Sequence, residues 1–143
     1  DYATFAELVR PLRAAGIPLH LGMGNHDHRA RFRTTLQTDA GGPPLVEDRQ
    51  ISIVPAERAN WFILDSLDQT NVTPGVLGAA QLAWLGKALD AHADKPALVM
   101  VHHNPNQGDS KGGLTETAAL LDLLGRHLHH ASVSLLQARA DGA

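Results

Sequence analysis

The sequence predicts an α/β fold in which strands alternate with helices that cover both faces of the sheet. Two apolar runs, 17–23 and 97–101, lack the polar alternation of a half-exposed strand and are typical of strands buried on both faces. Segments with apolar residues at helical spacing lie on either side of these runs. The length of 143 residues fits one domain with a single core.

The first expected element is a helix over residues 4–15. Its apolar residues recur at helical spacing and predict one face that packs on the core; they are Phe5, Leu8, Val9 and Leu12. Thr4 and Glu7 are spaced as a capping box at its start, and Gly16 favours its end. Pro11 is expected to kink this helix or to split off its first turn.

The run 17–23 follows as the first expected buried strand, and Gly24 lets the chain leave it in a sharp turn. Asp27 is expected to cap a second helix that continues to about residue 37. Residues 39–44 are then expected to form a loop, because glycine and proline cluster there.

The rest of the chain predicts a β-hairpin, a loop, an amphipathic helix, a buried strand, a polar loop, a helix and a short final strand. Leu82, Leu85 and Leu89 recur at helical spacing and mark the amphipathic helix. The corresponding ranges are 51–54 with 61–65, 68–78, 82–93, 97–101, 104–113, 115–127 and 133–136.

Composition restricts the kinds of partner. The net charge of -3 argues against a nucleic-acid-binding protein, so we expect no nucleic-acid partner. Arg29, Arg31 and Arg33 form the one basic cluster, which is either a solvated helix face or a patch that steers phosphate. The chain has no cysteine, so any metal must be held by nitrogen and oxygen ligands.

No apolar run approaches the roughly 20 residues that a membrane-spanning helix needs, so we expect no membrane partner. A cytoplasmic location follows as the expectation. The chain opens on Asp1 rather than Met, which leaves open an upstream segment such as a signal peptide. We make no prediction about the oligomeric state.

The residues that could carry chemistry lie directly after the two expected buried strands. Asn25 and His26 follow the first run, and His102 and His103 follow the second. In open α/β sheets, functional groups gather at the carboxyl ends of strands. An amide oxygen from Asn25 and an imidazole nitrogen from His102 suit a borderline or hard divalent ion, with His26 placed to act on a bound phosphate.

A purely structural interpretation stays open for these residues. The turn Gly24-Asn25-His26-Asp27 also suits an ordinary connection before a helix, in which Asp27 caps the helix. If the site does bind metal, Asp27 is expected to support the neighbouring ligands rather than to bind the ion itself. A histidine at a strand end is usually a satisfied polar residue, and this applies to His102 and His103. His28 is expected at the surface, where it either stays solvated or touches substrate.

Two motifs and the stretch between them resemble one family. Gly24-Asn25-His26-Asp27 resembles the Gly-Asn-His-Asp/Glu motif of the calcineurin-like metallophosphoesterases, and Val101-His102-His103-Asn104-Pro105 resembles their later His-bearing strand end. The intervening Leu64-Asp65-Ser66 and Gln81-Leu82-Ala83-Trp84-Leu85 are similar to the branch that contains cyclic-nucleotide phosphodiesterases and glycerophosphodiesterases. The resemblance extends from about Asp1 to His130.

The resemblance implies a layered α/β/β/α sandwich and a centre of two divalent metal ions, which are Mn, Fe or Zn. Asn25 and His102 look like ligands of one ion. His26 is similar to the family histidine that stabilises the phosphoryl transition state or protonates the leaving alcohol. His28 and His103 are expected to contact a small phosphoester substrate. In such centres the two ions clamp the phosphate and generate the attacking hydroxide.

The chain departs from the family pattern at both ends. No Asp-x-His or Gly-Asp-x-x-Asp motif precedes Asn25, and no Gly-His-x-His motif follows the run 133–136. We therefore expect residues 1–143 to form a partial calcineurin-like domain, an internal fragment that binds metal weakly and hydrolyses phosphodiesters marginally. Exposed sheet edges should also favour self-association. The alternative is a catalytically dead binding or interaction module that retains relic motifs.

Overall fold

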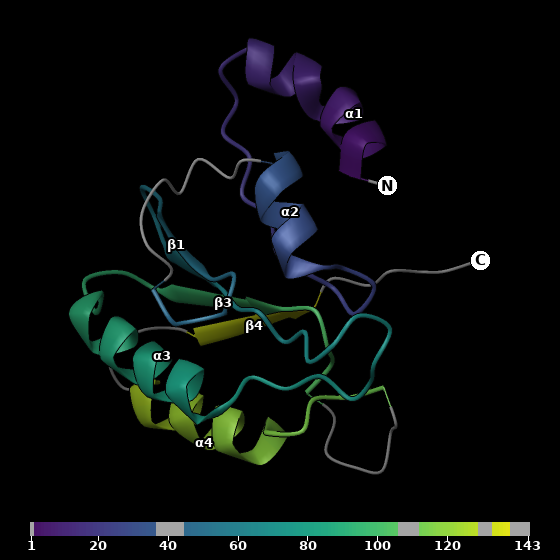
Figure 1. Ribbon diagram of the computed structural model, residues 1–143. Coiled ribbons are helices and arrows are strands. Elements are labelled where there is room, and N and C mark those ends of the chain that lie inside the picture. Colours follow the sequence, from purple (N-terminus) through teal and green to yellow (C-terminus); the bar gives the residue numbers. More distant parts are fainter. Residues whose placement is uncertain (1, 37–44, 106–111, 129–132, 138–143) are drawn as a thin grey trace.

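The computed structural model describes residues 2–36, 45–105, 112–128 and 133–137, and within these ranges helices lie on both sides of one four-stranded sheet (Figure 1). In chain order the elements are α1 (Tyr2–Ala14), α2 (Arg29–Leu36), β1 (Ser52–Pro55), β2 (Asn60–Ile63), α3 (Ala79–Ala91), β3 (Ala97–Val101), α4 (Thr117–His127) and β4 (Val133–Gln137). The predicted α/β class is confirmed. The layered α/β/β/α sandwich stays a prediction, because the described strands all belong to one sheet.

The sheet has the order β1-β2-β3-β4 and combines a hairpin with parallel strands. β1 and β2 are antiparallel, with Ser52 opposite Ile63, so the predicted hairpin is confirmed. β3 is parallel to both β2 and β4. The carboxyl ends of β2, β3 and β4 therefore lie at one edge of the sheet, and the residues that follow β2 and β3 are brought together there.

The main core, here called the sheet core, lies between the sheet and helices α3 and α4. Phe62 of β2 and Val99 of β3 point to this face and are fully buried with Leu85 of α3 and Leu120 of α4. The predicted helices and the predicted strands at 97–101 and 133–136 are thus confirmed as α3, α4, β3 and β4. Figure 1 shows α3 and α4 side by side on this face.

The other face of the sheet is covered less completely than the sequence predicts. Trp61, Leu98 and Met100 alternate with the core residues and remain only half-buried. Helices α2 and α1 lie on this side, with α1 farther from the sheet (Figure 1). A smaller apolar group, here called the N-terminal cluster, forms around them; its buried members are Met23, Phe32, Leu36 and Leu67.

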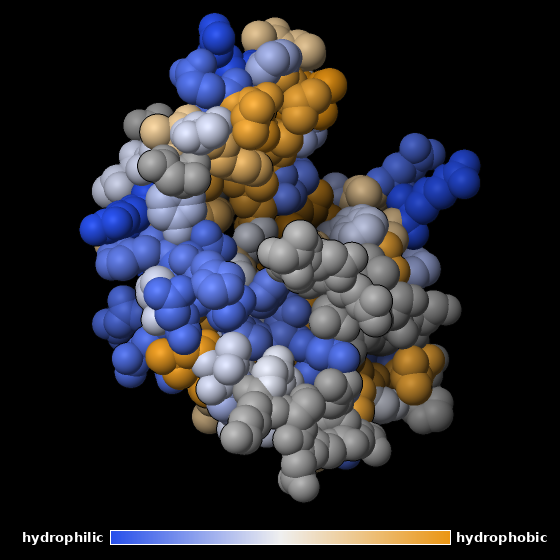
Figure 2. Space-filling view, turned by 90° about the vertical axis from the view of Figure 1, so that its right-hand side faces the viewer, coloured by the Kyte–Doolittle hydropathy of each residue, from blue (hydrophilic) through white to orange (hydrophobic). Residues whose placement is uncertain are grey.

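Helix α1 forms as predicted, and its Tyr2 and Ala6 pack against the N-terminal cluster, but much of its predicted apolar face is exposed. Leu8 is 73% exposed and Leu12 is 41% exposed, and no residue of α1 is buried. Figure 2 shows apolar side chains at the surface in the upper part of the molecule, where α1 lies. The capping box was wrong, because the helix begins at Tyr2, before Thr4. The helix continues without a break through Pro11 to Ala14, so no turn is split off, and the kink stays a prediction. Gly16, with φ 71°, ends it as predicted.

The strand predicted over 17–23 is not formed. The segment has no regular secondary structure. Ile17 is 49% exposed, Leu19 and Leu21 are half-buried between exposed neighbours, and Met23 is 1% exposed. A strand is defined by hydrogen bonds to a neighbouring strand, and the described strands pair only with one another. The apolar composition therefore buries one end of the segment without making it part of the sheet.

The predicted helix cap at Asp27 is also wrong. Helix α2 begins at Arg29, and His28 stands at its amino end, where its backbone oxygen accepts a hydrogen bond from Phe32 at 2.9 Å. The Asp27 carboxylate instead accepts a hydrogen bond from the Gly24 N–H at 2.7 Å. Asp27 thus closes the turn that precedes the helix, since its two carboxylate oxygens accept hydrogen bonds from Gly24 and Tyr2.

The whole of the expected loop 39–44 lies outside the described residues, as do residues 106–111 of the expected loop 104–113. The loop over 68–78 is irregular as predicted. Among the helices in the described ranges, none combines the length and apolar content needed to cross a bilayer.

Candidate functional site

The two histidine-bearing motifs meet at the carboxyl edge of the sheet. Nε2 of His102, directly after β3, lies 3.0 Å from Oδ1 of Asn25, although 77 residues separate them. Gly24 makes this approach possible, because a Cβ atom there would lie 3.1 Å from the His102 ring. The structure thus joins two side chains that the sequence predicts as partners.

His26 lies beside this pair and is exposed to solvent. Its Nε2 lies 3.5 Å from Nδ2 of Asn25, at the limit of a hydrogen bond. Its Nδ1 forms a short contact of 2.7 Å with Oδ1 of Asn71. Nothing in the sequence pattern pointed to Asn71, which comes from the irregular loop 68–78, 45 residues further along the chain.

His103 points away from this exposed group and is only 3% exposed. Its Nδ1 lies 2.8 Å from the Ser66 hydroxyl, and its ring lies edge-on to the His102 ring at 5.2 Å. Within the described part of the chain its buried Nε2 has no hydrogen-bond partner. Gly75 packs directly against this ring, since a Cβ atom there would come within 2.2 Å of Nδ1.

Both imidazoles are shifted toward the neutral form. Burial lowers the pKa of His102 and of His103 below the ordinary histidine value, because desolvation disfavours the charged ring. The nearby Asp27 charge acts on the pKa of His102 in the opposite direction and is the smaller effect. A neutral ring is the form that can ligate a metal ion.

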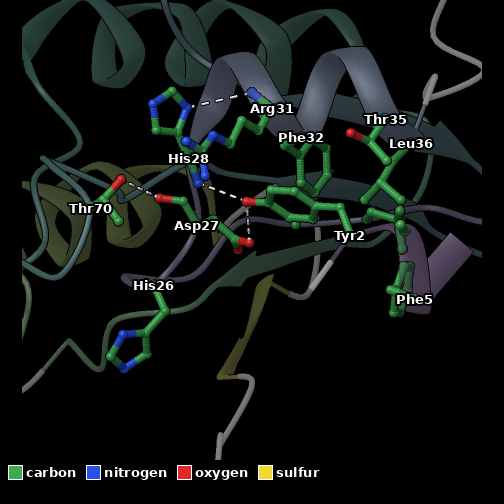
Figure 3. A pocket seen from close by; sticks show the side chains of 13 residues that line it. Tyr2, Phe5, His26, Asp27, His28, Arg31, Phe32, Thr35, Leu36 and Thr70 are labelled. Carbon is green, nitrogen blue, oxygen red and sulfur yellow. Dashed lines mark hydrogen bonds between the residues drawn. The ribbon is translucent and has the colours of Figure 1, made fainter.

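Asp27 holds the turn through hydrogen bonds that involve Tyr2 and Thr70 (Figure 3). Its Oδ1 accepts a hydrogen bond of 2.8 Å from the Tyr2 hydroxyl, which in turn accepts one of 2.7 Å from the His28 N–H. Its backbone oxygen accepts a hydrogen bond of 2.7 Å from the Thr70 hydroxyl. Desolvation raises the pKa of Tyr2, so its hydroxyl keeps the proton that it donates to Asp27.

A hollow of about 780 Å³ lies beside this turn, between α1, α2 and the segment that precedes Asn25. Phe5, Phe32 and Leu36 contribute apolar walls, while His28 and Arg31 line its polar side. His26 borders the hollow, but its ring is turned away from Phe32 in Figure 3. Neither Asn25 nor His102 lines it, so the hollow and the Asn25–His102 pair are neighbouring but separate features.

Asp65, which follows β2, is a buried carboxylate whose role the sequence did not indicate. Its two oxygens accept hydrogen bonds from Arg29 Nε at 2.7 Å, Arg29 Nη2 at 3.1 Å, and the N–H groups of Gln50 and Leu67, both at 2.9 Å. Its backbone exchanges two hydrogen bonds with the Gln81 amide, at 2.9 and 2.8 Å. With its acceptor positions filled, this carboxylate is a structural group rather than a metal ligand.

The residues present fit part of a metal site. At metal–ligand distances of about 2.1 Å, two ligands at a right angle lie about 3.0 Å apart, which is the separation of Asn25 Oδ1 and His102 Nε2. An amide oxygen and an imidazole nitrogen also suit Mn, Fe or Zn. Across the described ranges, however, no three His, Asp or Glu side chains are grouped so as to hold an ion. Catalytic zinc sites use three protein ligands, so this pair is an incomplete set.

Comparison with known proteins gives two curated relatives. The chain is similar to the 3',5'-cyclic adenosine monophosphate phosphodiesterase CpdA of Pseudomonas aeruginosa, with 36% identity over 130 residues, which cover 87% of this chain and 43% of that protein. It is also similar to the protein of the same name from Vibrio vulnificus (strain CMCP6), with 30% identity over 107 residues, 73% of this chain and 35% of that protein. The chain thus spans less than half the length of these relatives. No protein-family profile matches it.

Proposed function

We propose, from the premise that this chain belongs to the calcineurin-like metallophosphoesterase family, that Asn25 and His102 provide two ligands of a metal-dependent phosphodiesterase site. The relatives are named as phosphodiesterases, so hydrolysis of a small phosphoester is the activity that the resemblance supports. Because both relatives are named as 3',5'-cyclic adenosine monophosphate phosphodiesterases, a cyclic nucleotide is the first substrate to test. The assignment of residues 1–143 to part of one calcineurin-like domain is part of this proposal.

The observation that carries the proposal is the 3.0 Å contact between Asn25 and His102. In a metal-free chain this contact is a hydrogen bond. With a divalent ion present, Asn25 Oδ1 would bind through a lone pair, and the His102 ring proton would have to move to Nδ1 so that Nε2 could bind as well. The lowered pKa of His102 favours the neutral ring that this requires. The bound metal ions would neutralise the phosphate charge and lower the pKa of the attacking water.

His26 is proposed as the catalytic residue, because it lies exposed next to Asn25 and can reach a phosphoester held there. It would stabilise the transition state or protonate the leaving oxygen. Asp27 would hold the turn in place through Gly24 and Tyr2 without touching the metal. His28, which is exposed and borders the hollow, remains the proposed substrate contact on that side.

The substrate contact that the sequence predicts for His103 stays a prediction. The structure favours another role for this residue. The ring is buried between Ser66, Gly75 and His102. This placement favours a role in holding the neighbouring His102 ring through edge-on contact over direct contact with substrate.

The test is manganese binding and hydrolysis by the 143-residue chain. We expect weak manganese binding that Asn25→Ala and His102→Ala each abolish in a calorimetric titration, and marginal hydrolysis of cyclic AMP and of bis(p-nitrophenyl) phosphate. His20→Ala, which changes an exposed histidine outside the site, serves as the matched control and should bind like the unaltered chain. Manganese binding that survives both site substitutions would contradict the ligand assignment.

A relic interaction module is the second candidate, because Asn25 and His102 satisfy each other by a hydrogen bond and no third ligand joins them in the described residues. In that case manganese leaves the melting temperature unchanged, and His26→Ala alters neither binding nor hydrolysis. A metal-dependent rise in melting temperature that is lost in Asn25→Ala favours the enzyme site instead.

A further inference from the structure

The irregular loop after β2 is attached to the Gly24-Asn25-His26-Asp27 turn on both sides of His26. The Asn71 N–H donates a hydrogen bond of 2.7 Å to the Asn25 backbone oxygen, and the Thr70 hydroxyl donates one of 2.7 Å to the Asp27 backbone oxygen. Asn71 has φ 65°, a left-handed conformation that asparagine tolerates better than most residues. The position of the Asn71 side chain relative to the His26 ring is therefore determined by backbone contacts.

The contact between Asn71 and His26 has a chemical direction. The Asn71 Oδ1 atom lies 2.7 Å from His26 Nδ1, and an amide oxygen can only accept a hydrogen bond. Nδ1 must then carry the proton. In a neutral imidazole the other nitrogen, Nε2, is left with a lone pair.

A second contact agrees with this arrangement but, at the limit of hydrogen-bond length, is too weak to impose it alone. The amide nitrogen of Asn25 lies 3.5 Å from His26 Nε2 and can only donate. Asn25 is oriented this way because its oxygen faces Nε2 of His102. The hydrogen bonds thus run in one direction, from His102 to Asn25, from Asn25 to His26 and from His26 to Asn71.

We propose that Asn71 is a positioning residue that holds His26 as the Nδ1-protonated tautomer and keeps Nε2 as the nitrogen that exchanges protons with substrate. The inference rests on the proposed function for its chemical meaning. A proton taken from solvent resides on Nε2, next to Asn25. As the P–O bond breaks, the Nε2 proton is transferred to the leaving oxygen. His26 then returns to the neutral tautomer that Asn71 already stabilises.

The test reads the tautomer of His26 directly, on the ¹⁵N-labelled chain of 143 residues without metal or substrate. Two-bond ¹H–¹⁵N spectra at about pH 8.5, above the ordinary pKa of histidine, distinguish protonated from unprotonated ring nitrogens. The His26 signal is identified by its loss in His26→Gln. We expect it to show a proton on Nδ1 in the unaltered chain.

Three variants separate the role of Asn71 from a general effect on the loop. Asn71→Gly, which accepts the positive φ, should shift His26 to the Nε2-protonated form, whereas Asn71→Asp, which still accepts from Nδ1, should retain the Nδ1 proton. Thr70→Val removes the other side-chain attachment of the loop without touching His26 and should leave the tautomer unchanged.

The proposal is overturned by an Nε2 proton on His26 in the unaltered chain, a result that needs no variant to fold. It is also overturned if a folded Asn71→Gly chain keeps the Nδ1 proton. Because this readout requires neither metal nor catalysis, a failed manganese titration would remove the proposed function while leaving the Asn71–His26 result intact.

Discussion

The sheet core and the N-terminal cluster are built from similar apolar patterns but reach different degrees of burial. In the sheet core, residues such as Phe62, Val99 and Leu85 are fully buried between a sheet and two helices. In the N-terminal region, α1 has an equally regular apolar face, yet Leu8 is 73% exposed. An amphipathic pattern thus determines which face of a helix can be buried, while the neighbouring elements determine whether it is.

The largest expected effect comes from removing a side chain from the better-packed region. Phe62→Ala should lower the free energy of unfolding by about 3 to 5 kcal/mol, because it leaves a cavity between β2, α3 and α4. Leu8→Ala on α1 should change it by no more than about 0.5 kcal/mol. Urea unfolding followed by circular dichroism measures both. Comparable losses at the two positions would show that α1 is packed in solution.

The next effect tests the connection between the two regions. Arg29 opens α2 and pairs with the fully buried Asp65 after β2. Arg29→Ala should destabilise the chain by about 3 kcal/mol, because it leaves the buried Asp65 charge without its partner. This is the lower end of the range for a broken buried pair, since the Gln50 and Leu67 N–H groups still bind the carboxylate.

The exposed pair of Arg126 and Asp122 provides the control for that substitution. Both side chains are more than 60% exposed, at 64% and 67%, so Arg126→Ala should change stability by less than about 1 kcal/mol. Equal losses in the two arginine variants would mean that the Arg29–Asp65 pair does not hold α2 to the sheet.

The smallest effect concerns the close approach of two loops behind the candidate site. Gly75→Ala would place a Cβ atom 2.2 Å from the buried His103 ring and should destabilise the chain by about 1 to 3 kcal/mol. Gly125→Ala in α4 meets no atom within 4 Å and should instead stabilise by about 0.5 to 1 kcal/mol. Thermal unfolding of the pair checks the prediction; a neutral Gly75→Ala would indicate that His103 moves freely.

Some residues of the candidate site could be predicted from the sequence, and others could not. His102 could be placed because a short apolar run of β-branched and aliphatic residues predicts a buried strand, and a strand delivers the next side chain to a known edge. Asn71 could not be found, since it lies in an irregular loop without periodicity. Asp65 gives only a weak signal in the sequence, because a carboxylate beside an apolar residue such as Leu64 needs partners when it is buried, but the sequence does not identify them.

The N-terminal errors have the same physical origin. The run 17–23 has the composition of a buried strand, but pairing depends on hydrogen-bond partners that composition does not describe. Asp27 has the chemistry of a helix cap, but its carboxylate accepts hydrogen bonds from Gly24 and Tyr2 instead. Local patterns predict what a segment can do, and its neighbours select one of those possibilities.

The sequence by itself determined the α/β class, the elements of the sheet core and the motifs that place the chain among the metallophosphoesterases, because periodicity and short motifs are local properties. The tertiary structure brought the predicted partners Asn25 and His102 into contact, and it alone decided that Asn71 faces His26 and that Asp65 is neutralised by Arg29. These contacts join residues 36 to 77 positions apart. Such distances are bridged by strand register and loop path, which depend on the whole fold.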